Sequence, residues 1–148
     1  MEILEVTDNK EQYMDFLLLG DEQESMIEKY LNRGILFALY DDYDLKTVAV
    51  VTKEDEDTYE IKNIATVKTS QGKGYGSAMI KHIIQRHKTL CKHLIVGTGD
   101  NERILLFYEK LGFTYSHTIN DFFIKNYDHK IIEDGKQLKD MIYLKLKY

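Results

Sequence analysis

The stretch Gln71-Gly72-Lys73-Gly74-Tyr75-Gly76 has glycine at every second position, between a predicted strand over 59–67 and a predicted helix over 75–87. Glycine has no Cβ, so its backbone turns tightly and leaves its N–H groups accessible. N–H groups that converge at a helix N-terminus form a site for anions, because the unpaired donors and the helix dipole act together. The stretch therefore predicts a loop that binds phosphate.

Two other glycine motifs do not fit this loop. In the P-loop of nucleotide hydrolases, Ser or Thr directly follows the Gly-Lys pair, whereas Gly74 follows Lys73 here. The dinucleotide fingerprint requires a third glycine at the position where Ser77 stands. Taken alone, the loop could equally be a plain turn that joins a strand to a helix.

Composition limits the classes of protein to which the chain can belong. A chain of 148 residues is predicted to form a single domain over 1–148, and 43% hydrophobic with 30% charged residues is ordinary for a globular protein. A net charge of -5 without a basic block argues against a nucleic-acid partner, and no apolar run is long enough to span a membrane. The single Cys91 cannot form an internal disulfide, and no signal peptide is visible, so a cytoplasmic location is predicted.

Apolar periodicity predicts a mixed arrangement of strands and helices. The strands are predicted at 1–6, 35–40, 47–52, 59–67, 94–96, 113–118 and 142–147. Helical stripes are predicted at 13–17, 26–31, 75–87 and 101–111. The resulting order, β-α-α-β-β-β-α-β-α-β-β, is that of a mixed sheet covered by helices.

The starts of the first two helices carry the pattern of a capping box. Asp8 is followed three residues later by Glu11, and Asp21 is followed in the same way by Glu24. In a capping box the first side chain accepts a hydrogen bond from the backbone of the first turn, and the second reaches back to the cap. We therefore expect Asp8 and Asp21 to be N-caps.

Two of the predicted strands have an informative alternation. In the strand over 59–67 the apolar positions shift from odd (Tyr59, Ile61) to even (Ile64), which predicts a bulge or burial on both faces. At the end of the chain, Ile142 and the next two even-numbered residues are apolar and alternate with Tyr143 and two lysines. This last strand is predicted to be half-exposed, with Tyr143 on its solvent side.

Two segments together resemble one family. Gln71-x-x-Gly74-x-Gly76 resembles the acetyl-CoA signature Arg/Gln-x-x-Gly-x-Gly/Ala of the GCN5-related N-acetyltransferases, the GNAT superfamily. The second signature of that family is similar to Asn101-x-x-Ile104-x-x-Phe107-Tyr108-Glu109-Lys110-Leu111-Gly112-Phe113. The order and spacing of the two segments match as well. The chain departs from the family at Ile104, where Ala is common, and at Lys68 or Thr69, where Pro is common.

The resemblance implies an α/β (α+β) fold, with a mixed, mostly antiparallel central sheet of about six to seven strands, about four flanking helices and a splayed central strand pair. It also implies acetyl-CoA as the cosubstrate, and no metal is predicted. The pyrophosphate would meet the loop, the pantetheine arm would run beside the strand that precedes it, and Asn101 would bond the arm. The implied CoA-binding residues are Ala65, Thr66, Val67, Gln71, Gly72, Lys73, Gly74, Tyr75, Gly76, Ser77, Asn101 and Tyr108.

The resemblance also assigns catalytic roles. Tyr108 matches the family tyrosine and is the predicted general acid, because a phenol is protonated at neutral pH and can give a proton to the leaving thiolate. Periodicity alone would make Tyr108 a core aromatic. Glu60 is the candidate base, with a surface position on the strand as the alternative reading. Asp121 and His117 are further candidates for the base that no motif supports.

These features predict an N-acetyltransferase that moves the acetyl group from acetyl-CoA to a primary amine by direct attack in a ternary complex. The alternative is a CoA-binding sensor or regulatory module with the same fold and no turnover. The identity of the amine and the size of the acyl group stay open. The aromatic segment Asn120 to Gly135 either lines the acceptor site, forms a homodimer contact or only packs within the chain.

Overall fold

The computed structural model describes residues Met1–Tyr148 and contains one large mixed sheet. Its seven strands lie in the order β1-β2-β3-β4-β5-β9-β6, and every neighbouring pair is antiparallel except β4 and β5. The strands are β1 (Glu2–Val6), β2 (Ile35–Asp41), β3 (Asp44–Lys53), β4 (Thr58–Thr66), β5 (His93–Gly99), β6 (Thr114–Ile119) and β9 (Met141–Lys147). The prediction of a mixed, mostly antiparallel sheet is confirmed.

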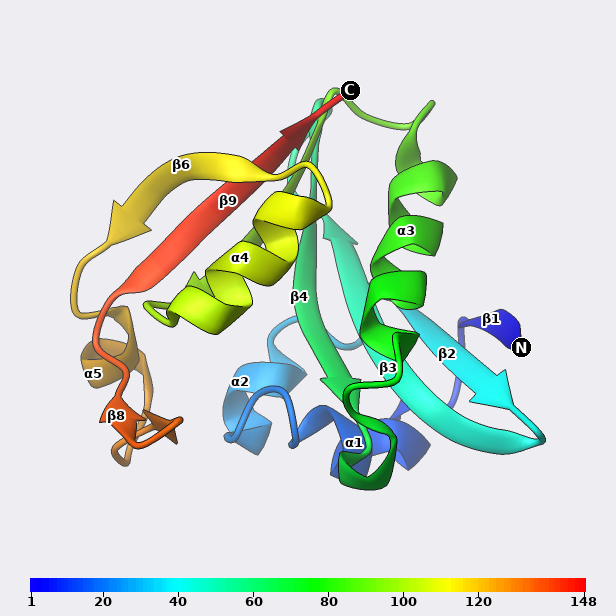
Figure 1. Ribbon diagram of the computed structural model, residues 1–148, viewed down its shortest axis with the longest axis horizontal. Helices are drawn as coiled ribbons and strands as arrows, with labels where there is room; N and C mark the ends of the chain where they lie inside the picture. The colour runs from blue at the N-terminus through cyan, green and yellow to red at the C-terminus, as the bar shows by residue number, and fades with distance from the viewer.

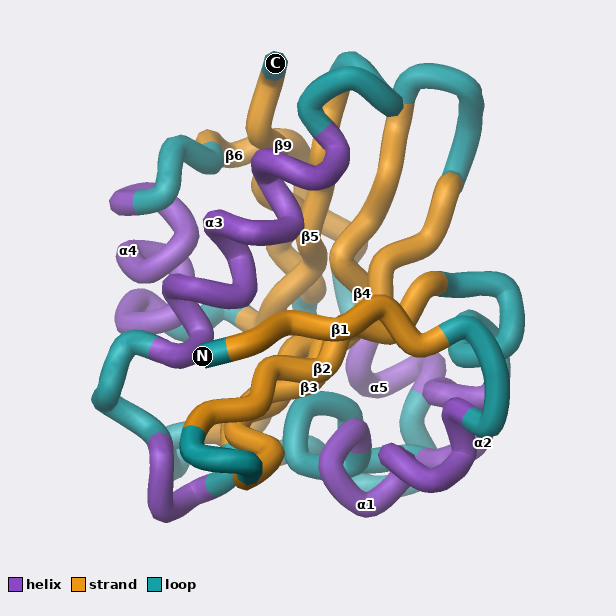
Figure 2. The backbone as a smooth tube through the Cα atoms, turned by 90° about the vertical axis from the view of Figure 1, so that its right-hand side faces the viewer, coloured by secondary structure: helices purple, strands orange, loops and turns teal.

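Helices cover both faces of the sheet. The long helices α3 (Tyr75–His87) and α4 (Glu102–Lys110) lie on one face. The other face is covered by the short helices η1 (Lys10–Tyr13), α1 (Met14–Leu17) and α2 (Glu24–Glu28), as Figure 2 shows. Because both faces are covered, the middle parts of β2 (36–39) and β3 (48–51) are continuous buried hydrophobic runs. Phe37 packs in the core on the α3 side and Leu36 in the core on the α1 side.

The central strand β4 is bulged, as the shift in its alternation predicted. Val50 of β3 faces Asn63, but the next residue, Val51, faces Ile61, so Lys62 is the extra residue. The bulge changes which residues point to each face. Ile61 packs on the α3 side, whereas Asn63 and Ala65 point toward the α1 side.

The two central strands separate after a short parallel stretch. They pair only from Thr58 with His93 to Ile61 with Val96, although β4 runs on to Thr66 and β5 to Gly99. Beyond this point β4 pairs only with β3 and β5 only with β9. The sheet therefore opens between β4 and β5, and Figure 1 shows β4 running away from β9 toward the other end of the molecule. The predicted splayed strand pair is confirmed.

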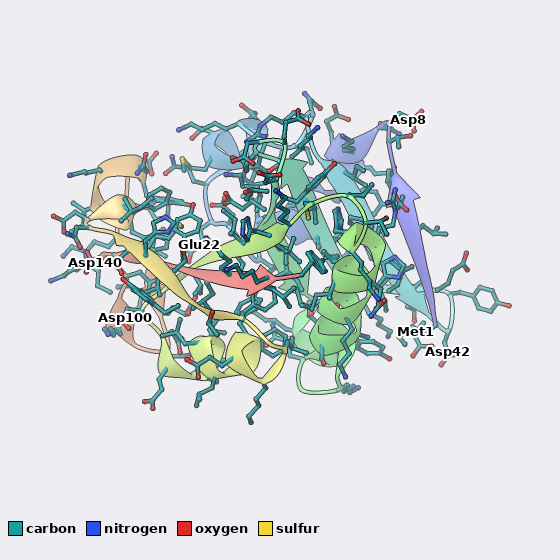
Figure 3. All side chains as sticks on the ribbon, turned by 90° about the horizontal axis from the view of Figure 1, so that it is seen from above. Met1, Asp8, Glu22, Asp42, Asp100 and Asp140 are labelled. Carbon is teal, nitrogen blue, oxygen red and sulfur yellow. The ribbon has the colours of Figure 1, made fainter.

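An insertion, residues 120–140, lies between β6 and β9 and was not predicted as separate elements. It contains α5 (Phe122–Asn126) and a hairpin of β7 (Ile132–Glu133) and β8 (Lys136–Gln137). Phe123, Ile131 and Leu138 form its own small core. Figure 1 places the insertion at one end of the molecule, and Figure 3 shows Asp100 and Asp140 at that same end.

Three sequence predictions about local structure are wrong. The first helix begins as η1 with Asn9 as N-cap, and α2 begins after Gln23, so neither Asp8 nor Asp21 caps a helix. Tyr143 is only 8% exposed, because its ring stacks on His117 of β6 and reaches over Gly97 of β5 to the buried Glu60. A separate finding concerns membranes: none of the helices combines the length and the apolar composition that a membrane-spanning segment needs.

Candidate active site

The glycine loop presents a row of unpaired backbone donors. The N–H groups of residues 72–77 make no hydrogen bond within the chain. Gly74 is the N-cap of α3 and has a left-handed backbone with φ 87, and Gly72 has φ 76. Both glycines face open space, so a ligand could approach the backbone closely. These N–H groups at the start of a helix of thirteen residues form an anion site of the kind that the sequence predicted.

The loop is held between the end of β4 and the two helices on this face. The side-chain amide of Gln71 donates to the carbonyl oxygen of Thr66 over 3.2 Å, which closes the turn. A Cβ built on Gly76 would lie 3.8 Å from both Thr66 and Phe107 of α4. Lys73 is exposed and forms no ion pair, so its charge is available to an anion in the loop.

The three residues expected to accompany the pantetheine arm lie where β4 leaves β5. Ala65 is buried and Thr66 and Val67 are half-buried. Ala65 and Thr66 pair with β3 on one side only, while the N–H of Val67 donates to the carbonyl oxygen of Lys46. The opposite edge of this segment has no strand partner, so an extended ligand could add to it in the way that a strand does.

Asn101 is the N-cap of α4, as expected of this residue type. Its Oδ1 accepts the backbone N–H of Arg103 over 3.0 Å. Its amide nitrogen donates to Glu133 over 2.7 Å and to Asp134 over 2.9 Å, both in the β7–β8 hairpin. Both amide hydrogens are therefore used within the chain, whereas Oδ1 can still accept a second hydrogen bond, for example from an N–H group of a pantetheine arm.

Tyr108 lies on the buried side of α4, 3% exposed. Its ring packs edge-on against Phe107 at 5.1 Å and Phe113 at 5.5 Å between ring centres. The hydroxyl forms no hydrogen bond within the chain, and burial raises the pKa of this phenol well above its usual value. Tyr108 is therefore a core aromatic whose hydroxyl is protonated and has no partner within the chain, and its role as the general acid stays a prediction.

Glu60 lies on the opposite face of the sheet and is not a surface residue, since it is only 6% exposed. Its Oε2 forms an ion pair with Lys62 over 3.1 Å and accepts a hydrogen bond from the hydroxyl of Tyr143 over 3.4 Å. Burial raises the pKa of Glu60, while Lys62 and Tyr143 oppose that shift. Burial thus makes Glu60 bind a proton more readily, while Lys62 and Tyr143 stabilise its ionised form. A carboxylate of this kind suits a general base.

The other two candidate bases are less suited to this role. Asp121 is exposed and precedes α5, with its backbone N–H bonded to Asp140. His117 is exposed on β6, but its ring stacks on Tyr143 with 4.7 Å between ring centres.

The single cysteine is not placed for catalysis. Cys91 is half-buried beside the carbonyl oxygen of His87, and burial raises the pKa of its thiol.

A second polar cluster on the α1 side was missed by the sequence reasoning. Asp21, expected to be an N-cap, instead accepts hydrogen bonds from the hydroxyls of Tyr30 over 2.8 Å and Tyr127 over 2.6 Å. Asn63 of β4 donates to the Tyr30 hydroxyl over 3.1 Å. The cluster joins the α1–α2 loop to β4 and to the insertion. The partners lie up to 106 residues apart, so no local pattern could have revealed it.

Comparison with known proteins agrees with this geometry. The family described as "Acetyltransferase (GNAT) domain" matches residues 32–115. The chain is 36% identical over 140 residues to the uncharacterized N-acetyltransferase YvbK of Bacillus subtilis strain 168, covering 93% of this chain and 90% of that protein.

Two solved structures are similar along almost the whole chain. A GNAT family acetyltransferase from Elizabethkingia anophelis with acetyl-CoA bound has a TM-score of 0.93 and 32% identity, over 99% of this chain and 97% of that one. A Bacillus subtilis acetyltransferase in complex with CoA has a TM-score of 0.91 and 32% identity, over 99% and 98%. The chain therefore belongs to the GCN5-related N-acetyltransferase (GNAT) superfamily, and the prediction of an acetyl-CoA-dependent N-acetyltransferase is confirmed at the level of that family.

Proposed function

We propose that the protein transfers the acetyl group of acetyl-CoA directly to a primary amine within a ternary complex. The observation that carries this proposal is the opening between β4 and β5: a protonated phenol packs on one face of the sheet, and a carboxylate is buried on the other face, one residue before the last pair of the two strands. Tyr108 packs with the core on the α3 side. Glu60 faces Thr52 of β3, which points to the same side as Val50 in the α1-side core.

The donor would bind along the edge of β4 and around the start of α3. The free N–H groups of residues 72–77 support a pyrophosphate there, and Lys73 adds a positive charge. The unpaired edge at Ala65 to Val67 supports an extended pantetheine arm. A backbone N–H of the β4 bulge near Lys62 would polarise the thioester carbonyl, as an oxyanion donor does. Two related proteins have been crystallised with acetyl-CoA and with CoA, which supports acetyl-CoA as the donor.

The acceptor would approach from the α1 side, where Glu60 lies. An alkyl amine with a pKa of about 10.4 is unprotonated in on the order of one molecule in 10³ at neutral pH, so a base has to take its proton. We assign that role to Glu60, directly or through one water. The amine nitrogen then bonds to the acetyl carbon, the C–S bond breaks, and the leaving thiolate takes the proton of Tyr108. The second proton of the acylated nitrogen returns to the Tyr108 oxygen, and Glu60 gives its proton to solvent, which restores both side chains.

Release of free thiol from acetyl-CoA, measured against a panel of amines, tests the proposal. The panel would contain small monoamines, diamines, aminoglycosides, peptides with free N-termini and lysine-containing peptides. We expect acceptor-dependent thiol release with at least one class. The same assay with propionyl-CoA would show whether the site takes a larger acyl group. CoA binding without thiol release across the whole panel would favour the sensor, the alternative function.

A cytoplasmic location is also proposed, because the single cysteine suits a reducing compartment.

A further inference from the structure

Tyr143 reaches across one whole strand to touch the candidate base. It lies on β9, where it faces Gly97 of β5, while Glu60 lies on β4, the strand beyond β5. A Cβ on Gly97 would lie 2.5 Å from Sδ of Met141 and 3.0 Å from Cζ of Tyr143, so glycine at this position leaves room for both side chains above β5. On its other side Tyr143 faces His117 of β6, and the two rings stack with an interplanar angle of 3°. The ring is therefore held from two neighbouring strands.

The two carboxylate oxygens of Glu60 have different environments. Oε2 forms an ion pair with Lys62 over 3.1 Å and accepts a hydrogen bond from Tyr143 over 3.4 Å. Oε1 accepts no hydrogen bond, and it is not among the buried polar atoms that lack a partner, so it keeps contact with solvent. A carboxylate fixed through one oxygen is limited in its rotation, and its second oxygen is available to a proton from outside.

We propose that Tyr143 is a positioning residue for the transfer reaction: its hydroxyl fixes Glu60 through Oε2 and leaves Oε1 to accept the proton of the attacking amine. This inference rests on the proposed function, in which Glu60 is the base. The proton moves from the amine nitrogen to Oε1, directly or through one water, and the Tyr143 hydroxyl keeps its own proton throughout. Gly97 is part of the same arrangement, because it leaves room for the Tyr143 ring.

The charged groups around Glu60 support this arrangement. Lys62 comes from β4 itself, Tyr143 from β9 and Glu54 from the turn after β3, where Lys62 also contacts Glu54 over 3.7 Å. The residues that pair with Glu60, Thr52 of β3 and Ile95 of β5, do not titrate. Burial and the neighbouring Glu60 raise the pKa of Tyr143, so its phenol stays a hydrogen-bond donor over the whole working range of pH.

The pH dependence of kcat/KM in Tyr143→Phe tests the proposal. The variant keeps the ring and its stack on His117 but removes one donor from the ionised form of Glu60, so the pKa of Glu60 should rise. We expect the acidic limb to move to higher pH by roughly half to one unit, a loss of about three- to tenfold on that limb, with unchanged CoA affinity. Tyr115→Phe, which removes an exposed hydroxyl on β6, is the matched control and should leave the profile unchanged.

Two further variants separate positioning from packing. Gly97→Ala should displace the ring and move the limb in the same direction although Tyr143 is intact. In a Glu60→Gln background, Tyr143→Phe should have no additional effect. An unchanged acidic limb in Tyr143→Phe, or an equal loss at every pH, would overturn the inference. Absence of acceptor-dependent thiol release in the unmodified protein would instead count against the proposed function itself.

Discussion

Tyr108 shows how one side chain can serve both the core and the chemistry. Its ring is enclosed by Phe107 and Phe113, and its hydroxyl has no partner within the chain. Burial disfavours the phenolate, which raises the pKa and keeps the proton on the oxygen until a stronger base appears. A leaving thiolate in the opening beside α4 would be such a base.

Tyr108→Phe is therefore expected to lower kcat by roughly 10²-fold, since general acid catalysis contributes on this scale. CoA affinity should change little, because the ring and its packing are retained. Thiol release under saturating substrates measures the first quantity, and calorimetric titration with CoA measures the second. Tyr43→Phe, at a fully exposed position, is the control. An unchanged kcat would remove Tyr108 as the acid.

At the residue scale the sequence reveals roles that depend on near neighbours in the chain. Asn101 is the N-cap of α4, a role that asparagine favours and that depends only on residues within one helical turn. The partner of Glu60 could not be found in this way, since Tyr143 lies 83 residues away. The alternation of its strand placed Tyr143 on the exposed side, and only the assembled sheet buries it between His117 and Glu60.

The glycine loop and α3 form the element that the sequence described best. The predicted helix over 75–87 is the observed one, because Gly74 starts it and the buried residues Met79, Ile80 and Ile83 recur at helical spacing. Gly74 has φ 87, a conformation in which any side chain is strained. The unpaired N–H groups next to it require both the glycine and the helix.

Gly74→Asp should weaken CoA binding by about tenfold or more, because it adds backbone strain and a negative charge beside the phosphates. Equilibrium titration with CoA measures the affinity. Gly135→Asp is a matched control, because Gly135 also has a positive φ of 77 and open space around it but lies in the β7–β8 hairpin. Equal CoA affinity in Gly74→Asp and the unmodified protein would contradict the assignment of the loop.

The insertion is the element that the sequence did not predict. Its helix and strands have two to five residues each, too short for a periodic signal. It is held at two places. Tyr127 bonds Asp21 at the α1–α2 loop, and Asp134 bonds both Asn101 over 2.9 Å and Arg103 over 3.1 Å at the start of α4.

Asp134→Ala should release the hairpin from α4 while leaving the sheet intact. We expect faster cleavage near Gly135 in limited proteolysis, with a Tm close to that of the unmodified protein. The carboxylate at this exposed position accepts two side-chain hydrogen bonds that alanine cannot replace. Asp8→Ala, at an exposed carboxylate elsewhere, should not change the cleavage rate. Unchanged cleavage in Asp134→Ala would show that the remaining contacts, such as Asn101 with Glu133, and the small core of the insertion are enough to hold the hairpin.

At the scale of the whole molecule, His87 joins α3 to the sheet. It is 1% exposed, its Nδ1 donates to the carbonyl oxygen of Ile83 over 2.8 Å, and its ring lies against Tyr59 and Phe37. Burial lowers the pKa of this imidazole, because the charged form would lose its hydration. The unfolded chain therefore binds a proton more readily than the folded protein.

The sign of the effect on stability follows from this difference. The contribution of neutral His87 is complete above the unfolded pKa of about 6.5 and is lost as the pH falls below it, toward the lower folded pKa. We expect Tm to decrease between about pH 7 and about pH 5.5. His87→Asn, which does not titrate, should lower Tm throughout but flatten this part of the curve. His117→Asn, at an exposed histidine, should keep the slope of the unmodified protein, and an unchanged slope in His87→Asn would contradict the assignment.

The overall arrangement could be predicted from the sequence only through the resemblance. Periodicity indicated which segments are strands, but strand order depends on contacts between distant segments, such as β5 with β9. In the chain, α3 lies between β4 and β5 and packs on one face of the sheet. Such a crossover through a helix brings the two strands together in parallel. The bulge in β4 was visible as a change of parity, whereas its consequence, the burial of Glu60 beside Tyr143, required the assembled sheet.

The short parallel contact between β4 and β5 also divides the sheet into two parts, or plates, that are connected only there. One plate consists of β1 to β4, and the other consists of β5, β9 and β6, and four residue pairs form the only strand pairing between them. The glycine loop follows the first plate, whereas Asn101 and Tyr108 follow the second. A long cosubstrate in the opening would contact both plates. We therefore expect its binding to limit changes in the angle between them.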